Sequence, residues 1–124
     1  MGWYAHIVAA VMSLGNHVHS GVATRFSAVG DAHNPTAYAA CFHRDMDDDS
    51  DRFVAHQTLP CKAKVLVCLP RPPWLCSRAR VGDRGPLHAE IDLAPLVAKD
   101  LGYGRRYGKH RGFNGMERVV FALE

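Results

Sequence analysis

The sequence lacks an apolar segment long enough to cross a membrane. Its most apolar stretch, residues 3–14, is shorter than the roughly 20 residues that a spanning helix requires. Internal repeats and low-complexity segments are also absent, and 124 residues accommodate one modest core without a second module. We therefore expect one domain with no membrane span and no appended wall-binding module.

The sequence has little excess of either charge. The formal net charge is +3, with 22% charged and 48% hydrophobic residues, which is typical of a globular protein. Such a charge attracts anionic surfaces only weakly. Because many of the basic residues gather in one loop, residues 102–115, nucleic acid is not expected as a partner.

The four cysteines show no CxxC spacing, so disulfides are favoured over zinc, and no metal or cofactor is predicted. An even number of cysteines in a short chain is typical of an oxidising compartment. Cys68 and Cys76 lie at the two ends of a predicted hairpin and are expected to pair across it. Cys41 would then pair with Cys61, although the sequence alone permits three connectivities.

Residues 1–20 form a segment separate from residues 21–124. The apolar stretch leads to Val18, His19 and Ser20, and the small last residue suits a signal peptidase. However, neither lysine nor arginine precedes the apolar stretch. A cleaved signal peptide and an N-terminal helix that packs on the domain or on a partner protein therefore both remain open.

Short runs rich in β-branched residues, separated by turn residues, predict a mainly β domain. A helical stripe begins at Leu93 and ends before Gly102. A six-stranded closed barrel with one or two short helices accounts for these elements. The expected strands are residues 21–28, 53–56, 63–68, 76–81 and 117–123, and a short helical turn is expected within residues 34–41.

Three motifs, in order along the chain, resemble the rare lipoprotein A family. GDRGP at residues 82–86, followed by IDLAPLVAKDLG at 91–102, is similar to its DRGP turn and IDLS helix. FVAHQTLP at 53–60 resembles its AAH-x-TLP signature, and GVATRFS at 21–27 resembles its opening strand. The resemblance implies a six-stranded double-psi β-barrel over residues 21–124, distantly related to expansins and family-45 endoglucanases.

Asp92 is the leading catalytic candidate. It lies between Ile91 and Leu93, in an apolar setting that favours a protonated acid able to donate to a glycosidic oxygen. The resemblance places it at the position that glycosidase relatives use as general acid. The competing interpretation is that Asp92 caps the following helix, because Ala94 stands where the family has a capping serine.

The resemblance implies four further site residues. Asp83, in the DRGP turn, would be the second catalytic carboxylate, although aspartate is also an ordinary turn residue. Arg84 would pair with one of the acids or reach the substrate. His56 would position groups around the acids, with a purely structural histidine as the alternative. Asp45 stands where the family usually has a glutamate and is shorter by one methylene.

Two charged segments flank these motifs. Residues 45–51 hold five carboxylates, which predict a solvated loop. Their alternate spacing resembles a calcium loop, but the central glycine is missing and His56 occupies the twelfth position. The basic loop at residues 102–115 contributes Tyr103 and Tyr107, which are expected to stack on sugar rings; binding of a polyanion and a plain solvated loop are the alternatives.

The resemblance implies a lytic transglycosylase that cleaves the bond between N-acetylmuramic acid and N-acetylglucosamine in peptidoglycan glycan strands. A non-catalytic, expansin-like protein that binds and loosens polysaccharide is the first alternative. The second is a structural barrel that docks into a larger assembly through residues 1–20. The expected location is secreted, periplasmic or cell-wall associated, or else within a phage virion.

Overall fold

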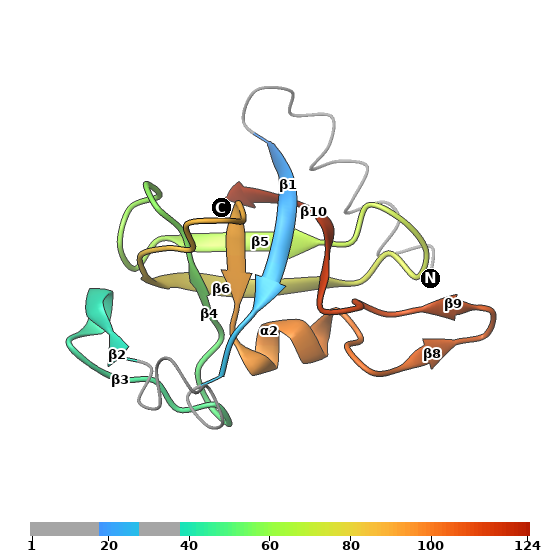
Figure 1. Cartoon of the computed structure of the whole chain (residues 1–124), viewed down its shortest axis with the longest axis horizontal. Helices are drawn as coiled ribbons and strands as arrows, with labels where there is room; N and C mark the ends of the chain where they lie inside the picture. Colours follow the sequence, from blue (N-terminus) through green and yellow to red (C-terminus); the bar gives the residue numbers. More distant parts are fainter. Residues whose placement is uncertain (1–17, 28–37) are drawn as a thin grey trace.

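The computed structural model describes residues 18–27 and 38–124, and their central feature is a closed barrel of six strands (Figure 1). The strands follow the order β1-β10-β5-β6-β4-β7. Two neighbouring pairs, β1–β7 and β4–β6, are parallel, and the other four are antiparallel. The predicted six-stranded double-psi barrel is therefore confirmed. The barrel strands are β1 (His19–Arg25), β4 (Phe53–Ala55), β5 (Lys64–Cys68), β6 (Cys76–Asp83), β7 (Ile91–Leu93) and β10 (Met116–Leu123).

Alternation of side chains builds the barrel core. In β6, the buried residues Ala79 and Val81 alternate with the exposed residues Arg78 and Arg80. The same period of two holds in β1 and β7, because successive strand residues point to opposite faces. Burial of each large apolar side chain contributes about 1.5–3 kcal/mol. The interior is filled mainly by branched side chains, among them Val54, Val65, Val67, Val81, Ile91, Leu93 and Val119.

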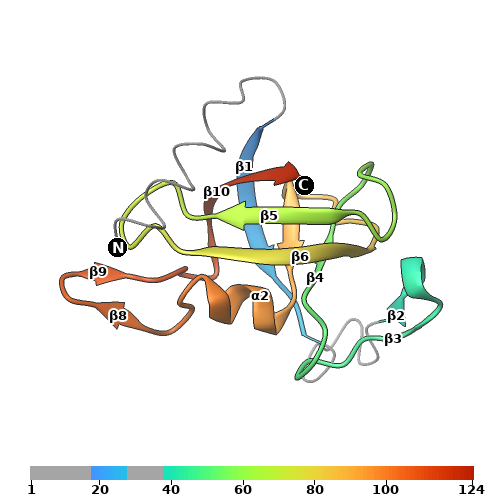
Figure 2. The same ribbon diagram turned by 180° about the vertical axis from the view of Figure 1, so that it is seen from behind.

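The elements outside the barrel are short. Helix α2 (Pro95–Asp100) and the 3-10 helix η2 (Ala40–Phe42) match the expected one or two short helices. Two small hairpins, β2 (Tyr38–Ala39) with β3 (Arg44–Asp45) and β8 (Arg106–Tyr107) with β9 (His110–Arg111), lie at opposite ends of the molecule (Figures 1 and 2).

The helical turn expected within residues 34–41 is only partly correct. Residues 34–37 lie outside the described residues, Tyr38 and Ala39 form a strand, and the 3-10 helix begins at Ala40. The pairing of Tyr38 with Asp45 explains the difference, because a cross-strand partner overrides a local helical preference.

Helix α2 packs on the barrel through Val97, Ala98 and Leu101, which are buried in the core. It starts at Pro95, whose fixed φ suits the first helical position. The prediction that the helical stripe begins at Leu93 is wrong, because Leu93 pairs with β1 and β4 as part of strand β7. The helix ends as expected at Gly102, which has a φ of 83° and donates its N–H to the Lys99 carbonyl.

Both disulfides pair as expected. Cys68 and Cys76 are register partners at the feet of the β5–β6 hairpin. Cys41 of η2 is bonded to Cys61, which ties the β2–β3 hairpin to the barrel. Two such bridges are typical of proteins from oxidising compartments, and an extracellular location is consistent with them.

Among residues 18–27 and 38–124, no helix is both long and apolar enough to pass through a bilayer. Residues 1–17 lie outside the described part of the chain. The signal peptide or docking helix expected within residues 1–20 therefore stays a prediction.

Candidate functional site

Asp92 belongs to a row of four residues that crosses four neighbouring strands. Thr24 of β1 lies opposite Asp92 of β7, Asp92 lies opposite Ala55 of β4, and Ala55 lies opposite Asp83 of β6. Ala55 is buried and the other three are half-buried. We call this set the four-strand row. It places one carboxylate on each side of a small side chain, with the two backbones about 10 Å apart, twice the spacing between strands.

Strand β7 holds Asp92 on the outer face of the barrel. Its neighbours Ile91 and Leu93 are both fully buried in the core, so the side chain between them points outward. The Thr24 hydroxyl donates a hydrogen bond of 2.9 Å to Asp92 Oδ1. Because a hydroxyl can also accept a bond from a protonated acid, this contact can persist when Asp92 gains or loses its proton.

The helix cap is a different residue. Ala94 is the N-cap of α2 and has no side-chain capping hydrogen bond, whereas Asp92 lies within a barrel strand. The capping interpretation of Asp92 is therefore not supported by the secondary structure.

A bulge in β6 sets the position of Asp83. Val54 pairs with Val81, but the next residue, Ala55, pairs with Asp83, so Gly82 is an extra residue in β6. Without it, Gly82 would lie opposite Ala55 and Asp83 would point to the other face of the sheet. The Asp83 carboxylate also accepts the backbone N–H of Arg84 at 2.8 Å.

Substitution of Gly82 by alanine is expected to destabilise the fold by about 1–3 kcal/mol. A Cβ on Gly82 would lie 2.6 Å from Cγ and 2.9 Å from Cβ of Phe53. Phe53 is only 5% exposed, and the clash lies near the root of its side chain, so the ring cannot swing clear. Urea unfolding measures the loss. In a Phe53→Ala background, which removes the ring contacts but keeps Cβ, the same substitution should cost less, although some cost remains; an equal cost in both backgrounds would show that the Phe53 ring is not the reason.

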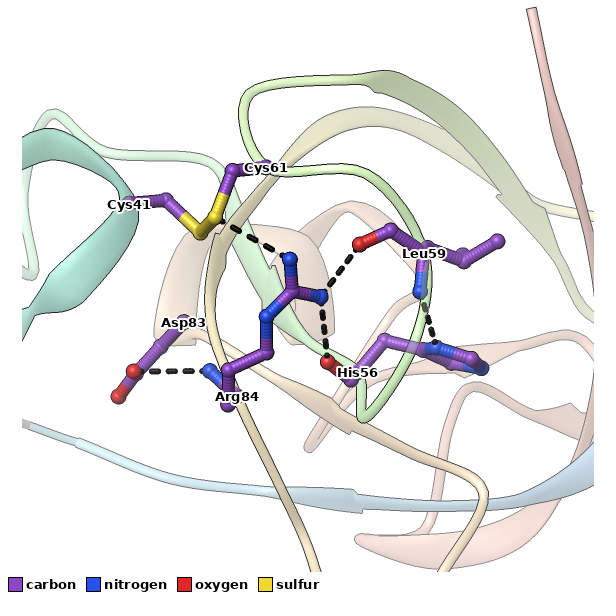
Figure 3. Close-up of a disulfide and its surroundings, with 6 residues drawn as sticks. All are labelled: Cys41, His56, Leu59, Cys61, Asp83 and Arg84. Carbon is purple, nitrogen blue, oxygen red and sulfur yellow. Dashed lines mark hydrogen bonds between the residues drawn. A yellow bond between two sulfur atoms is a disulfide. The ribbon is translucent and has the colours of Figure 1, made fainter.

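Hydrogen bonds join the turn after β4, which carries His56, to the turn after β6, which carries Arg84 (Figure 3). The N–H of His56 donates to the Asp83 carbonyl at 3.1 Å. Arg84 Nη1 donates to the carbonyl oxygens of His56, at 3.2 Å, and Leu59, and Arg84 Nη2 lies 3.2 Å from Cys61 Sγ (Figure 3). The Arg84 guanidinium thus holds the turn after β4 against the turn after β6.

His56 holds the same turn from inside. Its Nδ1 accepts the N–H groups of Thr58 and Leu59, both at 3.1 Å. It is 9% exposed, and burial, reinforced by the nearby His19, lowers the pKa of His56, while Glu90 opposes the shift. A neutral imidazole with its proton on Nε2 fits these contacts, because a protonated Nδ1 could not accept them.

This arrangement predicts a loss of stability on acidification. The folded pKa of His56 lies below its ordinary value of 6.5, so the unfolded chain binds the proton more readily. The stabilising contribution is complete above that value and is lost as the pH falls through the folded pKa. In His56→Asn the side-chain oxygen can accept the same N–H groups without titrating. The variant's urea midpoint should therefore fall less than the wild-type midpoint over this pH range. Parallel pH curves for the two proteins would contradict the assignment.

The remaining residues that are predicted to bind substrate do not lie together. Asp45 of β3 and Tyr107 of β8 are exposed and belong to the hairpins at opposite ends of the molecule (Figure 1). Tyr103 is nearer the row, because the guanidinium of Arg25 lies 4.5 Å from its ring centre and Arg25 follows Thr24 in β1. Asp45 and Tyr107 therefore cannot contact one sugar together.

The acidic segment is less solvated than predicted. Asp47 and Asp49 are exposed, but Met46 and Asp51 are buried. Asp51 accepts two hydrogen bonds from Arg44, at 2.7 and 2.9 Å, and these hold the pKa of Asp51 below its usual value. Across residues 18–27 and 38–124, no group of three or more histidine, cysteine or carboxylate side chains is placed to hold a metal ion.

Two members of the four-strand row were missed by the sequence reasoning. Thr24 and Ala55 both lie within the motifs GVATRFS and FVAHQTLP, yet nothing in those motifs tells which residues are opposite each other. The structure places Asp92 and Asp83 in the four-strand row and adds Thr24 and Ala55 to them. His56 and Arg84 instead join the turns that follow β4 and β6.

No protein-family model and no curated protein sequence matches the chain. Among solved structures, the Streptomyces papain inhibitor aligns with a TM-score of 0.50 and 20% sequence identity, over 85% of this chain and 94% of its own. The similarity shows a shared barrel fold.

Proposed function

We propose that the protein is a lytic transglycosylase that acts on peptidoglycan glycan strands, with Asp92 as both acid and base. The four-strand row is the observation that carries this proposal. It presents an outward carboxylate with a hydroxyl partner, next to a small side chain and a second carboxylate. Resemblance of the IDLAPLVAKDLG segment to the rare lipoprotein A family supports the choice of substrate.

In the proposed reaction, protonated Asp92 donates its proton to the oxygen that bridges N-acetylmuramic acid and the next sugar. The bond from C1 to that oxygen breaks, and positive charge develops at C1. The Asp92 carboxylate then takes the proton of the C6 hydroxyl, whose oxygen bonds to C1. The product is a 1,6-anhydro end, and no water is consumed. The Thr24 hydroxyl would serve both protonation states of Asp92.

The Asp83 carboxylate is proposed to stabilise the positive charge that develops at C1. This carboxylate already accepts the Arg84 N–H at 2.8 Å, which fixes the direction of the carboxylate. A site with two carboxylates is also open to hydrolysis, in which a water between them attacks C1. The products separate these two reactions.

His56 and Arg84 are proposed as positioning residues. Nδ1 of His56 is occupied by two backbone N–H groups, and the Arg84 guanidinium is bound to the turn after β4. Both contacts fix the ends of the two strands, which are Ala55 in β4 and Asp83 in β6. Tyr103 is the proposed sugar-stacking residue, because Arg25 covers one face of its ring while the residue remains 38% exposed.

Incubation with purified sacculi tests the proposal. Mass spectrometry of released fragments should show 1,6-anhydro-muropeptides that carry no oxygen from ¹⁸O-labelled water. Reducing ends with one labelled oxygen would indicate hydrolysis instead. Absence of any new fragment, with the protein fully folded by circular dichroism, would contradict glycan cleavage.

Glycan binding without cleavage is the second candidate. Asp45 occupies the position where the resembling family usually has a glutamate, but it lies on the exposed β3 hairpin outside the four-strand row. A protein without this carboxylate in its site would resemble an expansin and would use the four-strand row to bind polysaccharide without cleaving it. Retention on sacculi with unchanged glycan is its expected signature. Either function fits a secreted, cell-wall-associated or virion protein with two disulfides.

A further inference from the structure

A second surface, on the β5–β6 side of the barrel, is rich in cations. A cleft of about 480 Å³ is lined there by five basic side chains and only two carboxylates. Strands β5 and β6 face the viewer in Figure 2, whereas β1, which carries Thr24, lies in front in Figure 1. The basic residues that line the cleft are Arg44, Arg52, Lys64, Arg78 and Arg80.

Two of these cations are already neutralised. Arg44 is paired with Asp51 at 2.7 Å, and Arg52 is paired with Asp100 at 2.7 Å. Arg78 has only a loose pair with Glu124, at 3.5 Å, in which the arginine side chain is 78% exposed. Charge that is available to a ligand therefore concentrates on the strand face of β5 and β6.

Lys64 and Arg80 lie directly opposite each other across β5 and β6. Like charges in a cross-strand pair destabilise a sheet, because their Cβ atoms are only about 5 Å apart. Arg78 lies two residues from Arg80 on the same face, which corresponds to about 7 Å along the strand. A bound anion would relieve the repulsion among these three cations.

We propose that Lys64, Arg78 and Arg80 form a binding site for a linear phosphate polymer of high charge density. Three cations within about 7 Å match closely spaced phosphates better than isolated carboxylates, and guanidinium groups bind phosphate oxygens in pairs. The site is separate from Asp92, so the protein could hold an anionic polymer on one side of the barrel while glycan occupies the other.

Nucleic acid is disfavoured by the aromatic residues of the cleft. Binders of single strands offer open rings on which bases stack. Here Phe53 is 5% exposed, and Phe42 is stacked on it with ring centres 4.6 Å apart. Arg44 covers both rings at 5.5–5.7 Å. The ligand is therefore expected to carry phosphates without bases.

Binding of inorganic polyphosphate, measured by fluorescence anisotropy or calorimetry over a series of salt concentrations, tests the site. The triple variant Lys64→Gln/Arg78→Gln/Arg80→Gln should bind at least about tenfold more weakly at low salt. The slope of log affinity against log salt should decrease by about 2, from roughly 0.7 per lost contact. Because all three side chains are exposed, thermal unfolding should be little changed.

A matched control removes the same charge elsewhere. Arg105→Gln/Arg106→Gln/Lys109→Gln alters the exposed β8–β9 hairpin and should retain wild-type affinity. Equal weakening by the two triple variants would overturn the site, because net charge alone would then explain binding. Oligothymidine that binds as tightly as polyphosphate, or single phosphate that does so, would overturn the proposed ligand class. Anhydro-muropeptide release should be unchanged in the β5–β6 variant, so failure here is distinguishable from failure of the transglycosylase proposal.

Discussion

Replacement of Asp92 by asparagine is expected to reduce the release of 1,6-anhydro-muropeptides from sacculi by roughly 10²–10⁴-fold, the usual contribution of a general acid and base. An amide cannot donate a proton to the bridging oxygen or take one from the C6 hydroxyl. In the wild type the Thr24 hydroxyl donates a hydrogen bond of 2.9 Å to Asp92 Oδ1. The amide oxygen of asparagine can still accept this hydrogen bond. The strand register should therefore survive, and binding to sacculi should remain close to that of the wild type.

Two further aspartates serve as controls for the Asp92 variant. Asp83→Asn should lower the rate by a smaller factor, because it removes a stabilising charge but no proton transfer. Asp45→Asn should leave the rate unchanged, since Asp45 is exposed on the β3 hairpin. Full activity in Asp92→Asn would refute the assignment. Equal losses in Asp92→Asn and Asp45→Asn would show that the four-strand row is not the site.

Much of the barrel could be predicted because its determinants are local. Alternation of Arg78 and Arg80 with Ala79 and Val81 marks a strand with one face inside. A proline-rich turn between two strands places Cys68 opposite Cys76. The motifs then single out Asp92, although the strand that carries it, β7, is not among the predicted strands. Each of these inferences depends on residues that are close together in the chain.

The details of the site depend instead on pairing between distant strands. Thr24 and Asp92 are 68 residues apart, and their hydrogen bond follows from the parallel register of β1 and β7. The bulge at Gly82 is visible only once β4 and β6 are aligned. Arg84 was expected near an acid or substrate, but its guanidinium binds carbonyls of the turn after β4. A motif predicts which residues are present, whereas strand register decides what each contacts.

The basic loop shows the same distinction. Its composition, rich in glycine and arginine, predicts a solvated loop, and its tip is indeed exposed. Its base is tightly packed, however. The N–H of Gly112 donates to the Arg105 carbonyl at 2.9 Å, and the N–H of Phe113 donates to the Leu101 carbonyl at 2.9 Å. Arg71 adds a hydrogen bond from its guanidinium to the Gly112 carbonyl at 3.1 Å.

Gly112→Ala is accordingly expected to destabilise the protein by about 3 kcal/mol or more, at the upper end of the cost of overpacking. A Cβ on Gly112 would lie 2.6 Å from Gly102 Cα and closer still to the Gly102 carbonyl oxygen. These are backbone atoms, so no side-chain rotation relieves the clash. The segment that holds Gly112 and Phe113 can move away only by breaking its hydrogen bonds to the carbonyls of Arg105 and Leu101. Urea unfolding with the disulfides intact measures the effect.

Gly108→Ala is the matched control for Gly112→Ala, in the same hairpin. An added Cβ at Gly108 meets nothing within 4 Å, so the substitution should cost only the roughly 1–2 kcal/mol of a non-glycine residue at a φ of 63°. Equal destabilisation by the two variants would show that the clash with the Gly102 backbone is not the cause of the lost stability. If the clash does displace the hairpin base, Tyr103 moves with it, because Tyr103 follows Gly102 directly. Sugar binding should then weaken in Gly112→Ala and persist in Gly108→Ala, which would link the packing of this loop to the proposed site.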